Sequence, residues 1–346
     1  MFDNIIEEDL KFILKNVNLK HFRNSNILIL GGNSFLATYI QATLDYANKK
    51  NLKCNITSLS LNRPKGLFRE IYKNSQRIKF IKIDLNNTQI LKKILKKKFN
   101  FIFHCATYAP PKKWTNNQFS TVNLSTNILK IILDYSLKNK SKLLYFSSSA
   151  VYAPNDKSNL IDENHQLSIP QFHNKVIYSA SKIIGEYFCK IYKERGAKVY
   201  IVRPGHIYGP GQDIYDERAI SQLIKEAIFG KKIYLLNKND NIKTWGYLAD
   251  ITIMFLNIIQ KGKSLTYNTA GKDFASIYDL AKIISKYCNK KIVIKKNKSN
   301  NAFINSDYNK SKISSKKYFN EFKKFRFKNL KIGMKRLIDW NIGKTK

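Results

Sequence analysis

The fold of this chain is constrained most by an alternation of short apolar segments with longer amphipathic ones. Strands are predicted at six segments rich in β-branched and aromatic residues: 27–30, 56–61, 78–83, 101–103, 143–146 and 199–202. Apolar residues at helical spacing predict helices over 36–46, over 123–135 and from Tyr178 onward. Short apolar strands that alternate with helices are typical of a parallel sheet covered on both faces. The sequence therefore predicts an α/β fold with a doubly wound parallel sheet.

The net charge of the chain limits the classes of binding partner to be expected. The 346 residues include 62 Lys and Arg against 24 Asp and Glu, which gives a formal net charge of +38. Such an excess favours acidic partners, among them nucleic acids, anionic membranes and phosphorylated metabolites. The lysines are spread over almost every predicted polar face, and no nucleic-acid recognition motif accompanies them. We therefore expect attraction to phosphorylated metabolites rather than specific nucleic-acid binding.

The cysteines and the apolar segments indicate the cellular compartment. Cys54, Cys105, Cys189 and Cys288 are widely spaced, and no pair has the spacing of a metal site or a disulfide framework. Cys54 and Cys105 fall in or beside predicted strands, where small buried thiols are common. No apolar run is long enough to cross a bilayer, and the acidic N-terminus lacks a signal-peptide core. We expect a cytoplasmic protein with no metal site and no membrane partner.

One pair of segments points to chemistry. Tyr178 and Lys182 are four residues apart in a predicted helix and so lie on one face of it. A lysine ammonium there can stabilise a phenolate that would otherwise form only near pH 10. Ser148, at the end of an apolar run, can sit beside that phenol. Together these side chains can take the proton of an alcohol while a hydride leaves its carbon, although Tyr-x-x-x-Lys alone is also typical of a solvated helix face.

A glycine turn follows the first predicted strand. The segment Gly31-Gly32-Asn33-Ser34-Phe35-Leu36-Ala37 opens a predicted helix, which is where a dinucleotide pyrophosphate docks on free backbone N–H groups. The full fingerprint would have glycine in place of Ser34 and Ala37, but both replacements are small enough for close backbone approach. A turn with a purely structural role between a strand and a helix would have the same sequence pattern.

These segments and several others, in the same order and spacing, closely resemble the extended short-chain dehydrogenase/reductases, in particular the NAD-dependent nucleotide-sugar epimerases and dehydratases. The resemblance runs from about residue 26 to about residue 313. The segments that carry it are 31–37, Asp84-Leu85, 104–107, Asn123, 147–152, 178–182, 203–210 and 243–250.

The resemblance and the pattern along the chain together predict the domains. The strand–helix alternation weakens after Pro204, turn residues cluster at 209–211 and 237–241, and a capped helix is predicted over 276–287. We expect an N-terminal helical extension over 1–25, a dinucleotide-binding Rossmann domain over 26–203 and about 246–266, and a smaller α+β nucleotide-sugar-binding lobe over about 204–245 and 267–346.

The resemblance implies a role for each matching residue. Tyr178 would be the catalytic base, Lys182 its partner, and Ser148 would bond the reacting hydroxyl. The dinucleotide would be bound by Gly31, Ser34, Phe35, Leu36, Asn62, Arg63, Asp84, Leu85, Cys105, Ala106, Thr107 and Asn123, with Tyr178 and Lys182. The nucleotide sugar would contact Ser148, Ser149, His206 and Lys243. Lys243 stands where the family often has an arginine, and His206 where asparagine is usual.

The choice between NAD and NADP rests on the end of the second strand. A carboxylate there would bind the ribose diol and repel a 2′-phosphate. Here Asn62 and Arg63 follow the strand. Asn62 can bond a hydroxyl and Arg63 can pair with a phosphate, whereas the resemblance implies tightly held NAD. We expect NAD, with NADP possible.

The reaction is predicted from the residues after Ser148. The family's first step leaves a 4-keto sugar, after Tyr178 has taken the proton of the 4′-hydroxyl. A 4,6-dehydratase then uses an Asp-Glu pair, at the positions that Ser149 and Ala150 occupy here. We therefore expect a 4-epimerase. A 4,6-dehydratase and an NADPH-dependent 4-keto-sugar reductase stay as alternatives, and a decarboxylase, which usually has an acid near this site, is disfavoured.

Two further expectations concern partners. The net positive charge could also indicate a non-enzymatic protein that binds dinucleotides or RNA. The presence of Ser148, Tyr178 and Lys182 argues against that alternative. The resemblance also implies a homodimer, in which roughly residues 117–137 and 178–194 would form a four-helix bundle with their copies. Apolar positions in both segments support burial there.

Overall fold

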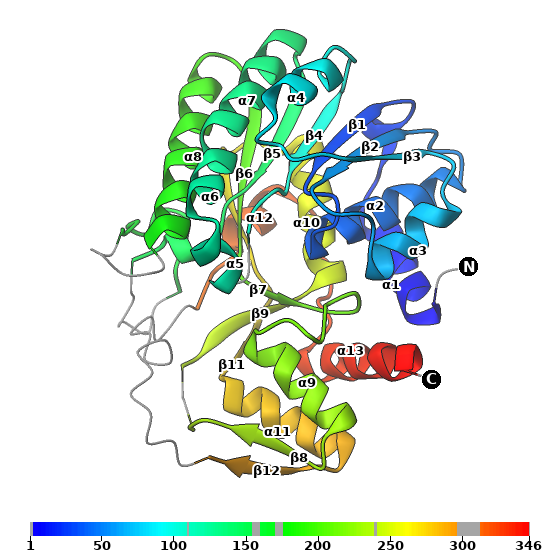
Figure 1. The fold of residues 1–346 in the computed structure, drawn as a ribbon, viewed down its shortest axis with the longest axis vertical. Coiled ribbons are helices and arrows are strands. Elements are labelled where there is room, and N and C mark those ends of the chain that lie inside the picture. Colours follow the sequence, from blue (N-terminus) through cyan, green and yellow to red (C-terminus); the bar gives the residue numbers. More distant parts are fainter. Residues whose placement is uncertain are drawn as a thin grey trace.

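A seven-stranded parallel sheet forms the centre of the protein (Figure 1). The computed structural model describes residues 3–108, 111–153, 160–169, 176–238, 241–295 and 312–345. The strands run in the order β10-β6-β5-β4-β1-β2-β3, and every neighbouring pair is parallel. Their bounds are β1 (Asn26–Leu30), β2 (Asn55–Ser60), β3 (Ile78–Lys82), β4 (Phe101–His104), β5 (Lys142–Phe146), β6 (Lys198–Pro204) and β10 (Thr266–Thr269). The predicted doubly wound α/β sheet is confirmed.

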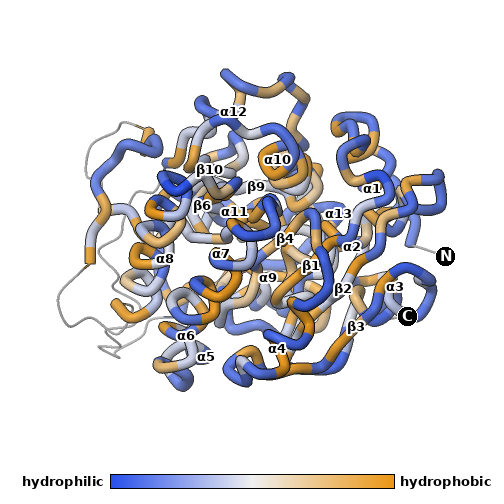
Figure 2. Tube along the Cα trace, turned by 90° about the horizontal axis from the view of Figure 1, so that it is seen from above, coloured by the Kyte–Doolittle hydropathy of each residue, from blue (hydrophilic) through white to orange (hydrophobic). Residues whose placement is uncertain are grey.

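The strands carry mostly apolar residues because helices cover both faces of the sheet. Along β1, Ile27 and Ile29 pack into one hydrophobic core, and Leu28 and Leu30 pack into the other. Successive side chains of a strand point to opposite faces, so a sheet buried on both sides favours apolar residues at consecutive positions. Seen from above, the interior strands carry hydrophobic colour and the peripheral loops are mostly hydrophilic (Figure 2).

Two groups of helices make these layers. The first core is shared with α1 (Asn4–Asn16), α2 (Phe35–Asn48), α3 (Gly66–Asn74) and α10 (Leu248–Lys261). The second is shared with α4 (Thr88–Ile94), α6 (Gln118–Ser125), α7 (Asn127–Asn139) and α8 (Val176–Glu194). The helix predicted over 123–135 is in fact two, because Thr126 leaves helical geometry at φ −118° and ψ −88° and separates α6 from α7.

A smaller group of elements lies below the sheet in the view of Figure 1. It contains a three-stranded sheet, β11-β9-β7, and a two-stranded sheet, β12-β8. The strand bounds are β7 (His206–Tyr208), β8 (Lys232–Leu235), β9 (Lys243–Tyr247), β11 (Asp273–Ala275) and β12 (Lys291–Ile294). The helices are α9 (Ala219–Phe229), α11 (Ile277–Cys288) and α13 (Leu330–Thr345), while the short α12 (Lys316–Glu321) lies against β10.

Two sequence features of this part are now explained. The helix predicted over 276–287 is α11, and Ser276 and Asp279 form a reciprocal capping box at its start. The division into lobes stays a prediction. β10 straddles the boundary predicted near residue 266, and it pairs with β6 in the large sheet.

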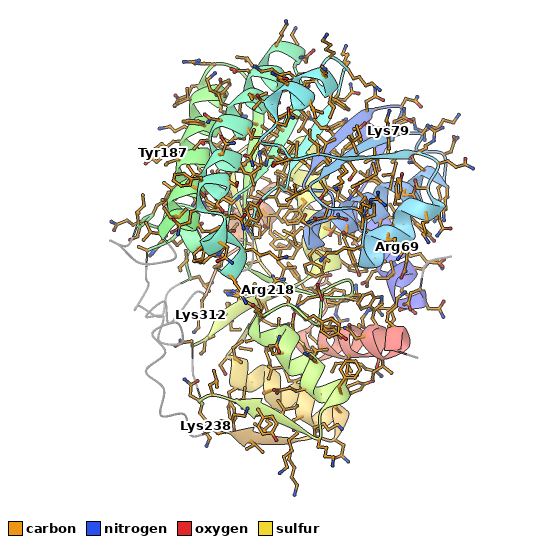
Figure 3. All side chains as sticks on the ribbon, viewed as in Figure 1. Arg69, Lys79, Tyr187, Arg218, Lys238 and Lys312 are labelled. Carbon is orange, nitrogen blue, oxygen red and sulfur yellow. The ribbon has the colours of Figure 1, made fainter. Side chains whose placement is uncertain are left out.

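The positive charge is dispersed rather than gathered in one stripe. The labelled Lys79, Lys238 and Lys312 lie on different parts of the molecule (Figure 3). The four cysteines are free, and Cys54, Cys105 and Cys189 are buried. Within the described ranges, no helix combines the length and the apolar character needed to cross a bilayer.

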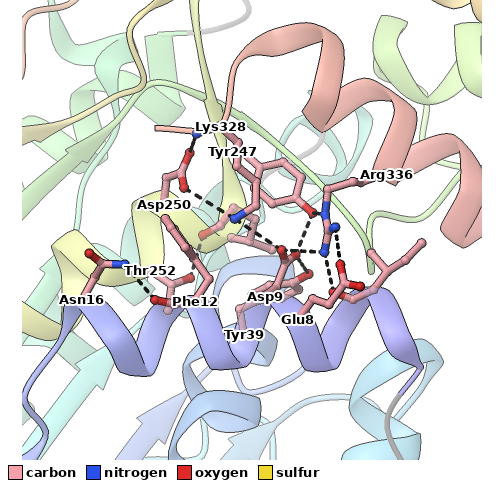
Figure 4. A network of polar contacts seen from close by, with 12 residues as sticks. Glu8, Asp9, Phe12, Asn16, Tyr39, Tyr247, Asp250, Thr252, Lys328 and Arg336 are labelled. Carbon is pink, nitrogen blue, oxygen red and sulfur yellow. Dashed lines mark hydrogen bonds and ion pairs between the residues drawn. The ribbon is translucent and has the colours of Figure 1, made fainter. Parts of the chain in front are cut away.

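The N-terminal helix is anchored by one buried carboxylate. Asp9 on α1 is fully buried, and the hydroxyls of Tyr39 and Tyr247 donate to its Oδ2 at 3.0 and 2.6 Å (Figure 4). Its Oδ1 accepts from Arg336 Nη2 at 3.0 Å and lies 3.5 Å from Lys328 Nζ. These partners come from α2, β9, α13 and the segment before α13, so Asp9 joins α1 to α2, to the three-stranded sheet and to the last helix.

Replacing Asp9 with Ala is expected to destabilise the protein by about 3 kcal/mol or more, because it leaves Arg336 and Lys328 without their shared buried counter-charge. Urea unfolding followed by circular dichroism measures the free energy of unfolding. Glu7→Gln is the control, since the Glu7–Lys11 pair on the same helix is exposed and should contribute nothing measurable. Equal stability of Asp9→Ala and the parent protein would contradict this account.

Candidate active site

A cavity of about 1400 Å³ opens where the carboxyl ends of the sheet strands face the smaller group of elements. Its walls come from the ends of β1 to β5, from Tyr178 on α8, from β7 and β9, and from the loop before α9. Parallel α/β sheets bind ligands at this edge. The volume exceeds the usual range for a single small ligand, which is about 300–1000 Å³, so two ligands fit side by side.

Most of the predicted site residues meet in this cavity. Its lining includes Gly31, Ser34, Phe35, Leu36, Asn62, Asp84, Leu85, Cys105, Ala106, Thr107, Ser148, Ser149, Tyr178, His206 and Lys243. Three predicted residues do not line it. Arg63 is exposed, Lys182 is buried behind the wall, and Asn123 donates through its side-chain amide to Asn86 Oδ1 at 2.6 Å.

The glycine turn packs too closely against neighbouring segments to accept a side chain. Gly31 has a φ of +80°, and a Cβ on it would come within 2.7 Å of Ala106 Cα. A Cβ on Gly32 would clash with Ser58 Oγ, and the backbone N–H groups of both glycines donate to Leu59 O at 2.9 Å. Ser34 then caps α2. A strand-to-helix turn of this shape fits the pyrophosphate of a dinucleotide.

The turns after β3 and β4 complete this half of the cavity. Asp84 Oδ1 accepts from the backbone N–H of Asn86 at 2.9 Å, so Asp84 acts as a turn residue as well as a wall residue. Leu85, Cys105 and Ala106 are buried apolar side chains beside it. An apolar pocket of this kind with one carboxylate at its rim fits an adenine ring and its ribose.

Tyr178 lies at the junction of the two halves of the cavity. Its side chain is hydrogen-bonded to Ser148 and to Thr107, and its ring stacks on Trp114 at 6.2 Å between centroids. Burial raises the pKa of Tyr178, while the two hydrogen bonds and the charge of Arg218 oppose that rise. The phenol therefore has Ser148 and Thr107 as polar partners, and its pKa is raised rather than lowered. That Ser148 bonds the reacting hydroxyl stays a prediction.

Lys182 differs from the expectation. Its Nζ donates to Phe146 O at 2.8 Å and lies 5.9 Å from the centre of the Tyr178 ring. Burial lowers the pKa of Lys182 to about 8. The expected lowering of the Tyr178 pKa by this ammonium is therefore wrong for the structure as it stands, because the cation that opposes the rise is Arg218 and burial outweighs it.

A buried ion pair behind the site was not foreseen from the sequence. Arg203 Nη2 lies 2.5 Å from Glu186 Oε2, and Arg203 Nε donates to Oε1 at 2.9 Å. Ser147 Oγ donates to the same Glu186 Oε1, and Arg203 Nη1 donates to Tyr152 OH at 3.0 Å. The pair connects α8, which carries Tyr178, to the end of β5 and to β6.

The other half of the cavity is cationic. Arg218 forms a bidentate pair with Asp216 at 2.9 and 2.8 Å, and Figure 3 shows it near the middle of the molecule. Burial, followed by the charges of Lys243 and Arg218, lowers the pKa of His206 to about 3, so its ring is neutral. Arg218 and Trp114 are among the lining residues that the sequence analysis missed, and neither belongs to a segment that carried the resemblance. Lys243 and Arg218, the latter paired with Asp216, form a suitable environment for a diphosphate.

Among the residues that the structure describes, no group of three or more His, Cys, Asp or Glu side chains is arranged to hold a metal ion.

Comparison with known proteins identifies one family. The family model described as the NAD dependent epimerase/dehydratase family matches residues 27–270. A dTDP-4-dehydro-6-deoxy-D-allose reductase of Streptomyces bikiniensis is 26% identical over 221 residues, which cover 60% of this chain and 66% of that protein. A dTDP-D-glucose 4,6-dehydratase of Dictyostelium discoideum is 29% identical over 286 residues, 77% of this chain and 56% of that protein. The chain thus spans between about half and two thirds of the length of these relatives.

A solved structure shows the same fold. The crystal structure of UDP-glucuronic acid 4-epimerase from Bacillus cereus, in complex with UDP-glucuronic acid and NAD, superposes with a TM-score of 0.75. The alignment covers 93% of this chain and all of that chain, at 19% sequence identity.

Proposed function

Because the chain belongs to the NAD dependent epimerase/dehydratase family, we propose that it is a nucleotide-sugar 4-epimerase that works through transient oxidation at C4. The observation that carries the proposal is the hydrogen-bonded pair of Tyr178 and Ser148 at the junction of a dinucleotide cradle and a cationic half-cavity. The family membership agrees with the resemblance seen in the sequence. The proposal makes the protein a cytoplasmic enzyme of sugar metabolism.

Each half of the cavity has a role in this proposal. NAD, when bound along the glycine turn, supplies a nicotinamide that can accept a hydride and return it. Tyr178 takes the proton of the sugar 4′-hydroxyl, and Ser148 holds that oxygen by a hydrogen bond. Lys243 and Arg218 bind the diphosphate, which anchors the nucleotide while the sugar remains free to turn. His206 and Ser149 line the space left for the sugar.

The carboxylates of the cavity favour epimerisation over dehydration. Ser149 and Ala150 follow Ser148, and neither can act as a strong acid or base. Three carboxylates line the described part of the cavity: Asp84 accepts from Asn86, Asp213 lies beside Lys65, and Asp216 pairs with Arg218. Expulsion of a C6 hydroxyl would require an acid and a base at that carbon.

A 4-keto-sugar reductase is the second candidate. It would use the same Tyr178 and Ser148 in the direction of reduction, with Tyr178 giving its proton to the forming hydroxyl. Asn62 at the end of β2, where a carboxylate would select NAD, favours it.

A panel of UDP- and dTDP-linked sugars, analysed by NMR and mass spectrometry, tests the proposal. The epimerase is expected to form a C4 epimer of unchanged mass without net consumption of coenzyme. Stoichiometric oxidation of NADPH would establish the reductase instead, and a product lighter by one water would establish the dehydratase. RNA retained in a salt-sensitive manner, with no dinucleotide bound, would favour a binding protein.

Replacing Tyr178 with Phe is expected to lower kcat by about 100- to 10 000-fold, because it removes the acid–base hydroxyl while the ring keeps its stacking on Trp114. Initial rates on the active nucleotide sugar measure this, and coenzyme binding should persist. Tyr187→Phe is the matched control, since Tyr187 is on the same helix and 58% exposed. Full activity of Tyr178→Phe would refute the mechanism.

The rate is expected to rise with pH on the alkaline side, because burial raises the pKa of Tyr178 and the base must be deprotonated to act. Ser148→Ala should move this limb to higher pH, since it removes a hydrogen bond that lowers the pKa of Tyr178. The profile of kcat/KM against pH measures the shift. Thr107→Val should shift the limb in the same direction, and a shift to lower pH in either variant would contradict the assignment.

We also propose that two copies pair through α6, α7 and α8. Ile184, Tyr187 and Ile191 are exposed along one face of α8, and Phe119 on α6 is 94% exposed. Tyr187→Glu is therefore expected to convert a dimer to a monomer in sedimentation velocity. Tyr234→Glu, at an exposed tyrosine on β8, should leave the dimer intact. A parent protein that sediments as a monomer would disprove the pairing.

A further inference from the structure

The cavity wall that follows β2 has no carboxylate of its own. Residues 61–66 read Leu-Asn-Arg-Pro-Lys-Gly, and both Asn62 and Lys65 line the cavity. Proteins that select NAD place an acid near this point to bond the ribose 2′-hydroxyl, and proteins that accept NADP place a cation there. The sign of the charge at this wall therefore matches a 2′-phosphate.

The loop that carries these residues is held against the glycine turn. The Asn33 side-chain amide donates to Asn62 O at 2.6 Å and to Arg63 O at 2.9 Å. With these two carbonyls bound, the backbone of the loop keeps one position relative to the turn that receives the pyrophosphate. The Arg63 side chain is exposed outside the cavity, so Lys65 is the cation of this loop that faces the ligand.

Two carboxylates approach this region from other elements. Asp84 is occupied by the amide groups of Asn86, at 2.9 and 3.0 Å. Asp213, in the loop before α9, lies 3.7 Å from Lys65 Nζ, with the two side chains 52% and 63% exposed. An exposed pair at this distance is weak, so Lys65 can exchange Asp213 for a stronger anion.

We propose that Lys65 recognises the 2′-phosphate of NADP(H), and that the protein consequently binds NADPH at least as tightly as NADH. The inference rests on the proposed function for the presence of a dinucleotide in the cavity. Lys65 gives up its exposed contact with Asp213 and forms a charge-assisted contact with a phosphate dianion. Asn62 bonds the remaining ribose hydroxyl in either dinucleotide.

Titration with NADH and NADPH, followed by the fluorescence of the reduced nicotinamide, tests this without any substrate. Lys65→Gln is expected to weaken NADPH binding about tenfold and to leave NADH binding unchanged, since only the 2′-phosphate loses its partner. Arg69→Gln, at an exposed arginine on α3, which begins directly after Lys65, is the control. Calorimetry with adenosine 2′,5′-bisphosphate and with AMP should show the same selectivity and isolates the phosphate from the nicotinamide.

Asp213→Asn distinguishes binding of a 2′-phosphate by Lys65 from binding of the ribose diol by Asp213. If Lys65 serves the phosphate, removing its competitor should tighten NADPH binding and leave NADH binding unchanged. If Asp213 instead bonds the ribose diol, Asp213→Asn should weaken NADH binding, and that result would overturn the proposal. Both positions are exposed, so neither variant should impair folding.

The outcomes separate this inference from the function on which it rests. Binding of NADH together with NADPH binding at least tenfold weaker would refute the role of Lys65 and leave the epimerase proposal standing. Binding of neither dinucleotide would refute both. Binding of NADPH that is sensitive to Lys65→Gln would support the inference, whichever sugar the enzyme turns over.

Discussion

The geometry of the candidate site depends on one buried pair of opposite charges, Glu186 and Arg203. Glu186 lies about two helical turns after Tyr178 on α8, and its carboxylate also accepts from Ser147, the neighbour of Ser148. Removing either partner of such a pair would leave an uncompensated charge in the interior. The pair therefore restricts α8 to one position against the sheet, and with it the distance between the phenol and the serine hydroxyl that the proposed chemistry requires.

Burial and charge are divided between two regions of the cavity. At the junction, burial raises the pKa of Tyr178 and lowers that of Lys182 to about 8, so the phenol is neutral near pH 7 while most of the lysine remains charged. In the other half of the cavity, burial, followed by the charges of Lys243 and Arg218, keeps His206 neutral. The cations of that half can attract an anionic ligand at a distance from the phenol. This separation lets a diphosphate anchor the substrate without disturbing the proton-transfer groups.

The large sheet could be predicted from the sequence because most of its strands contain apolar runs, as is typical of strands buried on both faces. β10 escaped prediction because Thr-Tyr-Asn-Thr is not an apolar run, and it becomes a strand only by pairing with β6. The break at Thr126 was also invisible, since apolar spacing continues across it. Residues at strand ends were predicted together because parallel strands bring their carboxyl ends to one edge. Trp114 was missed because its stacking on Tyr178 comes from tertiary structure. The influence of Arg218 on the pKa of Tyr178 also depends on tertiary structure, and the raised pKa of Tyr178 reflects burial that no spacing encodes.

The carboxylate of Asp9 has a consequence for biosynthesis. Its partners include Arg336, which is made hundreds of residues later, so a nascent chain carries an N-terminal helix whose buried acid stays incompletely paired throughout elongation. Tyr247 reaches the same acid from β9 and joins it before the tail does. Arg336 lies on α13, so the contacts of Asp9 are complete only once that helix has been made. Premature termination within that helix would leave the large sheet complete but α1 without its contact to Arg336. Such a product would be a target for quality-control proteases.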